Sequence, residues 1–284
     1  MPETSVVTDS VACLPQKFVD QYGLDIIPLT FIVGGKTYRD GIDINSKKAY
    51  ELFLQDPEIF KAAPSTPEDC LSILRQASQK AKNVLCITLS QKVSTEYNII
   101  RLAIERAKNE LLETRIEVID SETATAAQGL IVLAAARAAN SGKSFREVID
   151  IARNIKKKVH ALVLLDTVRY VYRSGRVPKI AAQAASVLNI KPIFNINGSV
   201  HFVTAARSKK NGIERLLILM RDKVGTQPIR AAVMHAYDPE EALKIKQQIV
   251  LEFNCIEIWI SEFSPVMGYA TGTGTLGIAF YSEA

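Results

Sequence analysis

The sequence predicts an α/β protein of two domains: an N-terminal three-layer α/β/α domain around a parallel sheet, and a C-terminal α+β domain with a mixed or antiparallel sheet. Short apolar runs alternate with amphipathic stretches through the first half, as in parallel α/β layers. Val84–Leu89 is continuously apolar, which is typical of a strand buried on both faces. In the second half, Asn197-Gly198 between two extended runs indicates a hairpin. We place the domain boundary after the basic Lys156-Lys157-Lys158, giving domains of residues 1–159 and 160–284.

The elements of the first half follow from periodicity and from helix-start signals. Thr66-Pro67-Glu68-Asp69 combines an N-cap hydroxyl, a first-turn proline and two acids, and Ser144-Phe145-Arg146-Glu147 is a capping box. Strands are expected at Ser5–Thr8, Asp25–Val33, Val84–Leu89 and Ile116–Ile119. Further helices are expected after Leu14-Pro15, over Asn45–Leu54, from Ile100 to Leu111, and over the alanine-rich Ala124–Asn140, which Gly142 closes.

The second half reads as strands with fewer helices between them. Strands are expected at Ala161–Leu165, Lys191–Ile196, Val200–Thr204, Arg230–His235, Cys255–Ser261 and Leu276–Tyr281. Helices are expected from about Lys210 to Lys223 and over Pro239–Phe253, and two short helical pieces flank Ser174-Gly175-Arg176. Because a hairpin joins adjacent strands in this half, the sheet is predicted to contain antiparallel pairs.

Composition narrows the class of protein. The chain has 284 residues, 48% of them hydrophobic, so it carries enough apolar side chains for a core and is not disordered. The net charge of +5 is spread along the chain and favours no nucleic-acid partner. Its four cysteines lie far apart without metal-ligand spacing, so no metal is expected. The start MPETSVVTDS lacks the pattern of a signal peptide and no apolar run reaches the ~20 residues of a membrane span, so we expect a cytoplasmic protein.

Hydroxyl and carboxyl side chains follow three strands of the predicted parallel sheet. They are Asp9 and Ser10, the loop from Ser90 to Thr95, and Asp120 with Ser121. The carboxyl ends of parallel strands share one edge of a sheet, where ligands bind, so these residues are expected to line a crevice. Ser94 also begins a helix, whose free N–H groups attract an anion. The plainer interpretation is that Ser94 is an N-cap and Asp9 a turn residue.

Other candidate sites are weaker. No GxSxG elbow is present, and His160, His201 and His235 have no evident Ser-Asp partners. The segment Gly272–Gly277 (GTGTLG) lacks the lysine of a phosphate loop and is read as a tight turn. Basic residues gather in two segments of the second half and form either a solvated face or a docking patch for an acidic or phosphorylated partner. They are Arg169, Arg173, Arg176, Lys179, Arg207, Lys209 and Lys210.

The motifs along the whole chain resemble those of the DegV family, the fatty-acid-binding subunits of bacterial fatty acid kinase. TDSVACLP is similar to the family's TDS-x-x-x-LP, and LSQKVSTEYN is similar to its LS-x-x-x-SGTY. IIPLTFIVGGKTYRDGIDI and DTVRYVYRSGRVPKIAAQAASVLNIKPIF resemble two longer family segments. The resemblance implies a non-catalytic protein without a cofactor that buries a long-chain fatty acid. A kinase partner would phosphorylate the acid to an acyl phosphate, with no nucleic acid and at most transient membrane contact.

The resemblance also implies roles for particular residues. Ser94 corresponds to the hydroxyl that binds the carboxylate, and Ser65 to the serine of the family's T-S-Q-P turn. Arg176 and Arg207 match arginines of the GGR and K-x-R segments, and would face the kinase partner or its nucleotide phosphates. The full carboxylate-binding set implied in this way is Ser94, Thr95, Ser65, Thr66, Thr271 and Gly272.

Several positions depart from the family pattern. Pro64 and Thr66 stand where the family has Thr and Gln, and Ala270 and Thr273 replace the His and Pro of its G-x-H-x-GPG segment. Glu96 lies two residues from Ser94, where it would repel a carboxylate if it pointed inward, or support the helix start if it pointed outward. Two explanations stay open: a fatty-acid carrier with a rebuilt carboxylate site, or a relative that binds another lipid or a neutral ligand.

Two enzymatic alternatives stay open beside the binding protein. One is a phosphotransfer-type enzyme, because the family shares its fold with dihydroxyacetone kinase subunits. Its candidate metal ligands would be Asp9, Asp40, Asp43 and Asp120, although no phosphate-loop lysine accompanies them. The other is a serine esterase with Ser94 as the nucleophile, for which the sequence indicates no histidine base.

Overall fold

The computed structural model describes residues 3–107, 110–176 and 190–283. Its first layer is a parallel sheet of order β2-β1-β6-β7. The strands are β1 (Thr4–Asp9), β2 (Asp25–Ile27), β6 (Asn83–Thr88) and β7 (Arg115–Asp120). Helices α3 (Pro67–Lys80) and α4 (Glu96–Ala107) cover one face, where their apolar side chains form a core with those of the strands. The predicted parallel layer is confirmed.

A six-stranded mixed sheet of order β10-β9-β8-β13-β11-β12 forms the second layer, and all its strands come after residue 159. They are β8 (His160–Leu164), β9 (Lys191–Asn197), β10 (Ser199–Ala206), β11 (Ile229–His235), β12 (Cys255–Glu262) and β13 (Leu276–Ser282). Only β11 and β12 pair in parallel. The predicted hairpin is confirmed, with Gly198 at φ 69° between β9 and β10. Helices α9 (Lys209–Val224) and α10 (Pro239–Glu252) cover the outer face.

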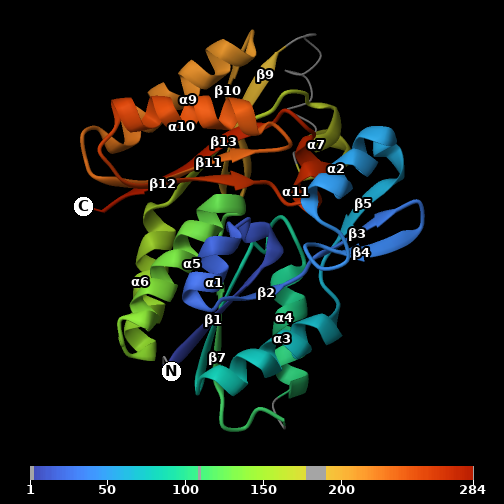
Figure 1. Cartoon of the computed structure of the whole chain (residues 1–284), viewed down its shortest axis with the longest axis vertical. Coiled ribbons are helices and arrows are strands. Elements are labelled where there is room, and N and C mark those ends of the chain that lie inside the picture. The colour runs from blue at the N-terminus through green and yellow to red at the C-terminus, as the bar shows by residue number, and fades with distance from the viewer. Residues whose placement is uncertain (1–2, 108–109, 177–189, 284) are drawn as a thin grey trace.

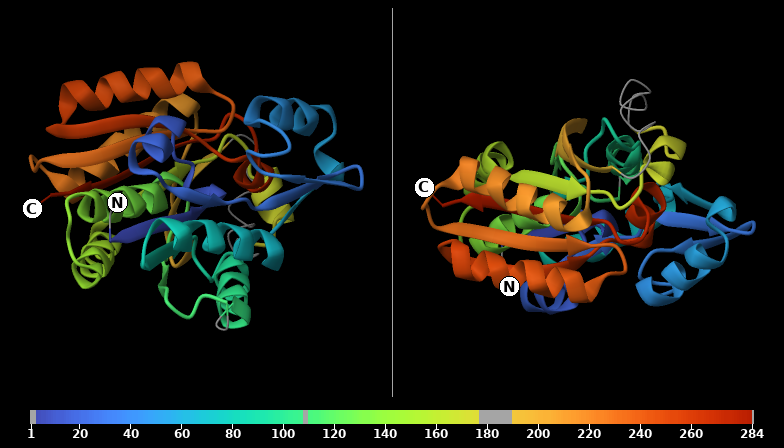
Figure 2. Two further views of the ribbon diagram at one scale, coloured as in Figure 1. Left: turned by 60° about the horizontal axis from the view of Figure 1, so that its bottom comes forward. Right: turned by 90° about the horizontal axis from the view of Figure 1, so that it is seen from above.

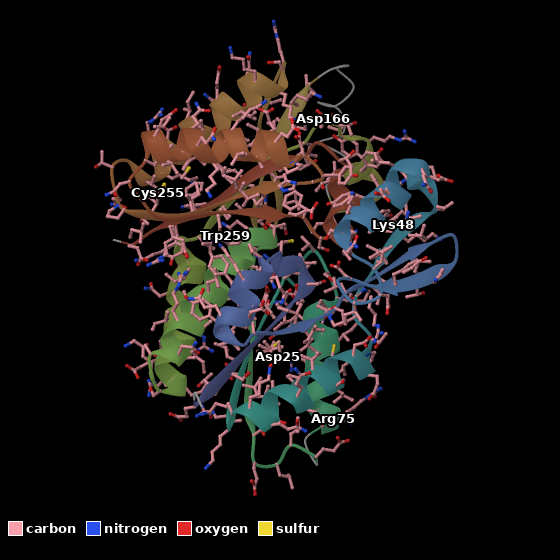
Figure 3. The ribbon with its side chains drawn as sticks, in the orientation of Figure 1. Asp25, Lys48, Arg75, Asp166, Cys255 and Trp259 are labelled. Atoms are coloured by element: carbon pink, nitrogen blue, oxygen red, sulfur yellow. The ribbon has the colours of Figure 1, made fainter. Side chains whose placement is uncertain are left out.

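Helix α5 (Thr125–Asn140) lies between the two sheets, with α1 (Gln16–Tyr22) and α6 (Phe145–Lys158) beside it. The layers therefore follow one another as α/β/α/β/α (Figures 1 and 2). The helix is rich in alanine and buried almost all round, because both of its faces meet a sheet. At Gly129 a Cβ would lie 2.8 Å from the carbonyl oxygen of Ala12 and 3.4 Å from Trp259, so the helix approaches its neighbours closely. Trp259, on β12, is labelled in Figure 3.

A small antiparallel sheet of order β4-β3-β5 stands to one side and corrects one prediction. Asp25–Val33 is not one strand, because the chain breaks at Pro28-Leu29, leaving β2 in the parallel sheet and β3 (Thr30–Val33) in the small sheet. Proline has no N–H for a sheet ladder and restricts the residue before it. The other strands are β4 (Lys36–Arg39) and β5 (Phe60–Ala63), with α2 (Ser46–Gln55) and the short 3-10 helix η2 (Pro57–Ile59) between them.

Three more short helices lie within the described residues. They are the 3-10 helix η1 (Ser10–Ala12), α7 (Arg169–Arg173) and α11 (Pro265–Thr271). The sequence predicts a helical piece near α7 but none at α11, which packs against α2, α7, β3 and β5. The second helical piece expected after Arg176, and Lys179 within it, lie outside the described residues. Over the part of the chain that the structure describes, no helix is both long enough and apolar enough to cross a bilayer.

Candidate ligand site

A mostly apolar cavity of about 390 Å³ lies where the two large sheets and α11 meet. Its walls come from both halves of the chain. The first half contributes Val11, Leu29, Leu89 and Ala124, and the strands of the mixed sheet contribute Val163, Phe194, Ile196 and Val200. Helix α11 contributes Val266, Met267 and Ala270. A cavity lined in this way suits an apolar ligand, because burial of alkyl surface is favourable and demands no hydrogen bonds.

Polar groups line the same cavity around the start of α4. They include Ser94 and Thr95, together with Gln91, Lys92, Ser174 and Arg176. Ser94 is partly exposed, and its Oγ accepts a hydrogen bond from the backbone N–H of Glu96 at 3.2 Å. The serine therefore holds the first residue of α4 from the position before Thr95, whose carbonyl oxygen accepts the first backbone bonds of the helix, and it lines the cavity at the same time. Its hydroxyl hydrogen has no acceptor among the described residues, so it is available to an anion.

Arg176 lies against this polar part of the cavity. Its Nε donates to the carbonyl oxygen of Val93 at 3.1 Å, and its Nη1 donates to that of Ser174 at 3.1 Å. Burial lowers the pKa of its guanidinium, because the charged form loses hydration. No described carboxylate lies within ion-pair distance of it, so the guanidinium is a cation at the cavity that can still pair with an anion.

Arg207, the second predicted docking residue, lies elsewhere. It is exposed, between β10 and α9, and does not line the cavity. Arg176 and Arg207, to which the sequence assigns the same docking role, therefore lie in different places in the structure.

Glu96 points neither at the ligand cavity nor out to solvent. Its buried carboxylate accepts hydrogen bonds from the hydroxyl of Ser65 and from the backbone N–H of Ser65, the latter at 2.8 Å. The hydroxyl of Ser65 also lies 3.0 Å from Cys70 Sγ. Burial raises the pKa of Glu96. The predicted ligand residue Ser65 is therefore bonded within the protein, and its neighbour Pro64, not Ser65, lines the cavity.

Asp9 is buried behind the cavity wall. Its Oδ1 accepts from the backbone N–H of Val11 at 3.0 Å and its Oδ2 from that of Leu89 at 2.7 Å. Val11 and Leu89 both line the cavity, so Asp9 holds two parts of the wall together. Burial, with a smaller contribution from the charge of Glu96, raises the pKa of Asp9 to about 8. Asp9 and Ser10 line a separate polar cavity of about 490 Å³ instead.

The side chains of Asp120 and Ser121 hydrogen-bond to nearby backbone groups. Asp120 Oδ1 accepts from the backbone N–H of Glu122 at 2.8 Å and from that of Gln91 at 3.4 Å, and Ser121 Oγ donates to the carbonyl oxygen of Thr123 at 3.1 Å. Neither residue lines the ligand cavity. The three strand ends that the sequence groups into one crevice are thus divided among the cavity, the separate polar cavity and a closed turn.

The other residues predicted to bind the carboxylate head group do not all lie at the cavity. Thr66 caps α3 by accepting from the backbone N–H of Asp69 at 3.1 Å, and it is exposed. Thr271 lines the cavity, but its hydroxyl donates to the carbonyl oxygen of Met267 at 3.0 Å. Gly272 has φ 82°, and a Cβ there would lie 2.3 Å from the ring of Tyr170, so that ring fills the space beside it.

Gln91 and Lys92 belong to the predicted loop from Ser90 to Thr95, whereas α11 and Ser174 are absent from the predicted site. For α11 a signal is readable: Ser264-Pro265 combines an N-cap side chain with a first-turn proline. Val266, Met267 and Ala270 then follow at helical spacing. For Ser174 no local signal exists, because a polar residue at the end of a short helix is ordinary in any loop.

The geometry gives little support to the enzymatic alternatives. None of the three histidines lines the cavity beside Ser94; His235 lies in the separate polar cavity, and its Nδ1 accepts from the backbone N–H of Asp238. The GTGTLG turn closes on other side chains, since a Cβ at Gly274 would lie 3.2 Å from Asp166. Neither a general base for Ser94 nor an open phosphate cradle is present in the described residues.

Comparisons with known proteins agree with this geometry. The family described as "Uncharacterised protein, DegV family" matches residues 3–283. Protein DegV of Bacillus subtilis is 29% identical over 279 residues, which cover 97% of this chain and 98% of that protein. The crystal structure of DegV, a fatty acid binding protein from Bacillus subtilis, is similar with a TM-score of 0.89 and 28% identity over 100% of both chains.

A second solved structure has the same fold. It concerns fatty acid binding of a DegV family protein from Thermus thermophilus, and is similar with a TM-score of 0.89 and 26% identity, covering 99% of this chain and 100% of that one. The two-sheet architecture, with a parallel sheet in the first half and a mixed sheet in the second, is thus shared with these structures. This chain belongs to the DegV family.

Proposed function

We propose that this protein binds a long-chain fatty acid, with the alkyl chain in the 390 Å³ cavity and the carboxylate beside Ser94, Thr95 and Arg176. The observation that carries the proposal is the cavity itself, which is apolar along both sheets and α11 and polar at the start of α4. Each buried methylene contributes about 0.8 kcal/mol, whereas the charged head must keep hydrogen bonds. Fatty acid binding by the similar proteins from Bacillus subtilis and Thermus thermophilus supports the same assignment.

Arg176 supplies the positive charge that the rebuilt head-group site needs. Ala270 and Pro64 offer no side-chain donor, and Ser65 is bonded to Glu96. Thr271 already donates to Met267. A guanidinium with free N–H groups pairs with a carboxylate more strongly than neutral hydroxyls do. The departures from the family motifs are therefore compatible with an acid as ligand.

Extraction tests this assignment directly. Mass spectrometry of organic extracts from the purified protein should show a long-chain acid bound in stoichiometric amount. After removal of the bound fatty acid, the melting temperature of the protein should rise when C14–C18 fatty acids are added. Extraction of a neutral lipid instead would favour the second candidate, a carrier for another lipid. An empty extract together with no thermal shift would contradict both.

Ser94→Ala should weaken fatty-acid binding by about 1–3 kcal/mol, the usual cost of a lost hydrogen bond to a charged group. Isothermal titration with the acid that the extraction identifies measures the change. Ser72→Ala, which removes an exposed hydroxyl from α3 outside the cavity, is the matched control and should bind as the wild type does. Unchanged affinity in Ser94→Ala would place the carboxylate elsewhere.

The same proposal includes a partner. The chain would present the bound carboxylate to a fatty acid kinase, whose nucleotide donates its terminal phosphoryl group to a carboxylate oxygen and leaves as the diphosphate. Arg207 is exposed, and in this proposal it would contact that partner or its phosphates. Catalysis would belong to the kinase and not to this chain.

Arg207→Glu should therefore lower acyl phosphate formation at least tenfold in a reconstituted kinase assay, while fatty-acid affinity stays unchanged. Like charge at a docking surface slows association and weakens the complex. Arg146→Glu, a charge reversal on exposed α6, is the control and should leave turnover unchanged. Loss of fatty-acid binding together with turnover in Arg207→Glu would instead indicate a structural role for Arg207.

A further inference from the structure

A cavity of about 200 Å³ lies where α6 ends and β8 begins, apart from the fatty-acid cavity. Its lining brings together Lys156 and Lys157 from the end of α6, His160 from β8, Asn195 from β9, Lys223 from the end of α9, and Glu122. It shares only Ile196 with the fatty-acid cavity. Because α6 precedes the predicted domain boundary and the other elements follow it, this cavity spans the junction between the halves.

The charges around this junction cavity do not cancel. Lys156 forms an ion pair with Glu122 at 2.8 Å. No described carboxylate lies within ion-pair distance of Lys157 or Lys223, so two exposed lysines at the cavity have no counter-charge among the described residues. A lysine near a helix C-terminus is common, because it interacts favourably with the carbonyl end of that helix. That explanation covers each lysine singly, but it does not account for two helix ends and their lysines meeting at one cavity.

Two uncharged polar groups lie among the lysines. Asn195 Oδ1 is buried and has no hydrogen-bond partner among the described residues. Since the two ends of an amide have the same shape, the reversed side chain would aim an N–H₂ donor at the same place. The His160 ring packs against Phe280 at 5.3 Å between centroids, and burial, with a smaller contribution from the charge of Lys223, lowers the pKa of His160 to about 4. The histidine is therefore neutral at pH 7 and carries one N–H donor.

We infer that this junction cavity binds a small anion bearing a phosphate group. Two ammonium groups, an imidazole N–H and an amide surround the space, and phosphate offers the charge and the acceptor oxygens to satisfy them. The volume is below the roughly 300–1,000 Å³ of pockets for drug-sized ligands, so the ligand is inorganic phosphate or a small phosphate monoester. A bound anion would contact α6 and also β8, β9 and α9, and so would stabilise the two halves against each other.

Titration of the full chain with inorganic phosphate, in phosphate-free buffer at pH 7 and constant ionic strength, tests the inference. Isothermal titration should show saturable binding, and the melting temperature should rise with phosphate concentration. The double variant K157Q/K223Q should bind phosphate at least tenfold more weakly. K47Q/K82Q removes the same charge from exposed positions outside the cavity and should bind as the wild type does. No saturable binding, or an equal loss in both double variants, would overturn the inference.

Two further measurements identify the ligand and locate it. Phosphate should shift the NMR signals of the His160 ring more than those of His201, which lies in an exposed part of β10. If the His201 ring responds as strongly, binding is diffuse and the site is refuted. Tighter binding of glycerol phosphate than of inorganic phosphate would identify a monoester as the ligand, and equal binding would identify the phosphate group alone. Fatty-acid affinity measured in K157Q/K223Q should be unchanged, which separates this test from that of the proposed function.

Discussion

Ala270→Phe should lower fatty-acid affinity more than a hundredfold without unfolding the protein. Ala270 lies on the face of α11 that lines the cavity, beside Val266 and Met267, and only 7% of it is exposed. A phenyl ring placed there would occupy the space of about four methylene groups. At about 0.8 kcal/mol for each methylene, the loss is about 3 kcal/mol. Because the ring enters an open cavity and not a filled core, it should cost little stability.

Competition against a fluorescent fatty acid measures this effect. Ala205→Phe places the same ring on an exposed position of β10 and should leave affinity unchanged. Ala270→Val, a smaller insertion, should give an intermediate loss. Thermal melts of each variant show whether the fold is retained. Wild-type affinity in a folded Ala270→Phe variant would mean that the alkyl chain does not lie along α11, and the proposed orientation would be wrong.

The free energy of unfolding should fall as the pH rises from 6.5 to 8.5, chiefly because of Asp9. In the unfolded chain this carboxyl loses its proton near pH 4, whereas burial in the folded state raises its pKa to about 8. Between these values the folded state holds a proton that the unfolded state has released, so stability falls as pH rises. Over this window the loss is about 2 kcal/mol. Glu96 and Asp40, whose pKa values burial also raises, act in the same direction.

Urea unfolding at several pH values between 6.5 and 8.5 measures the slope. Burial lowers the pKa of His160 and of His235, so their effect has the opposite sign, but it falls mostly below pH 6.5 and outside the window. Asp9→Asn should flatten the slope. It should also lower stability at pH 6.5, because an amide oxygen replaces the two oxygens that accept from Val11 and Leu89. Asp222→Asn, at an exposed carboxyl, is the control. An unchanged slope in Asp9→Asn would refute the assignment.

The candidate site shows where local sequence signals reach their limit. Ser94 is identifiable because a hydroxyl at a helix start and the family motif indicate the same residue, and it does line the cavity. Glu96 shows the opposite case. Both orientations that its position allows are wrong, because its partner Ser65 lies 31 residues away in the chain. Arg176 is similar: its sequence marks it as functional, but only the fold shows that it lies at the cavity and apart from Arg207.

The sequence by itself determined where several of the elements begin and end. Some features depend only on neighbours within a few residues, so the sequence alone predicts them. They are the caps at Thr66 and Ser144, the buried strand at Val84–Leu89 and the hairpin at Asn197-Gly198. The tertiary structure alone decided which strand ends open on the cavity, how Asp25–Val33 divides between two sheets, and that α5 is enclosed by both large sheets. These features arise from contacts between distant segments, where burial, close approach and the pairing of buried polar groups outweigh local preference.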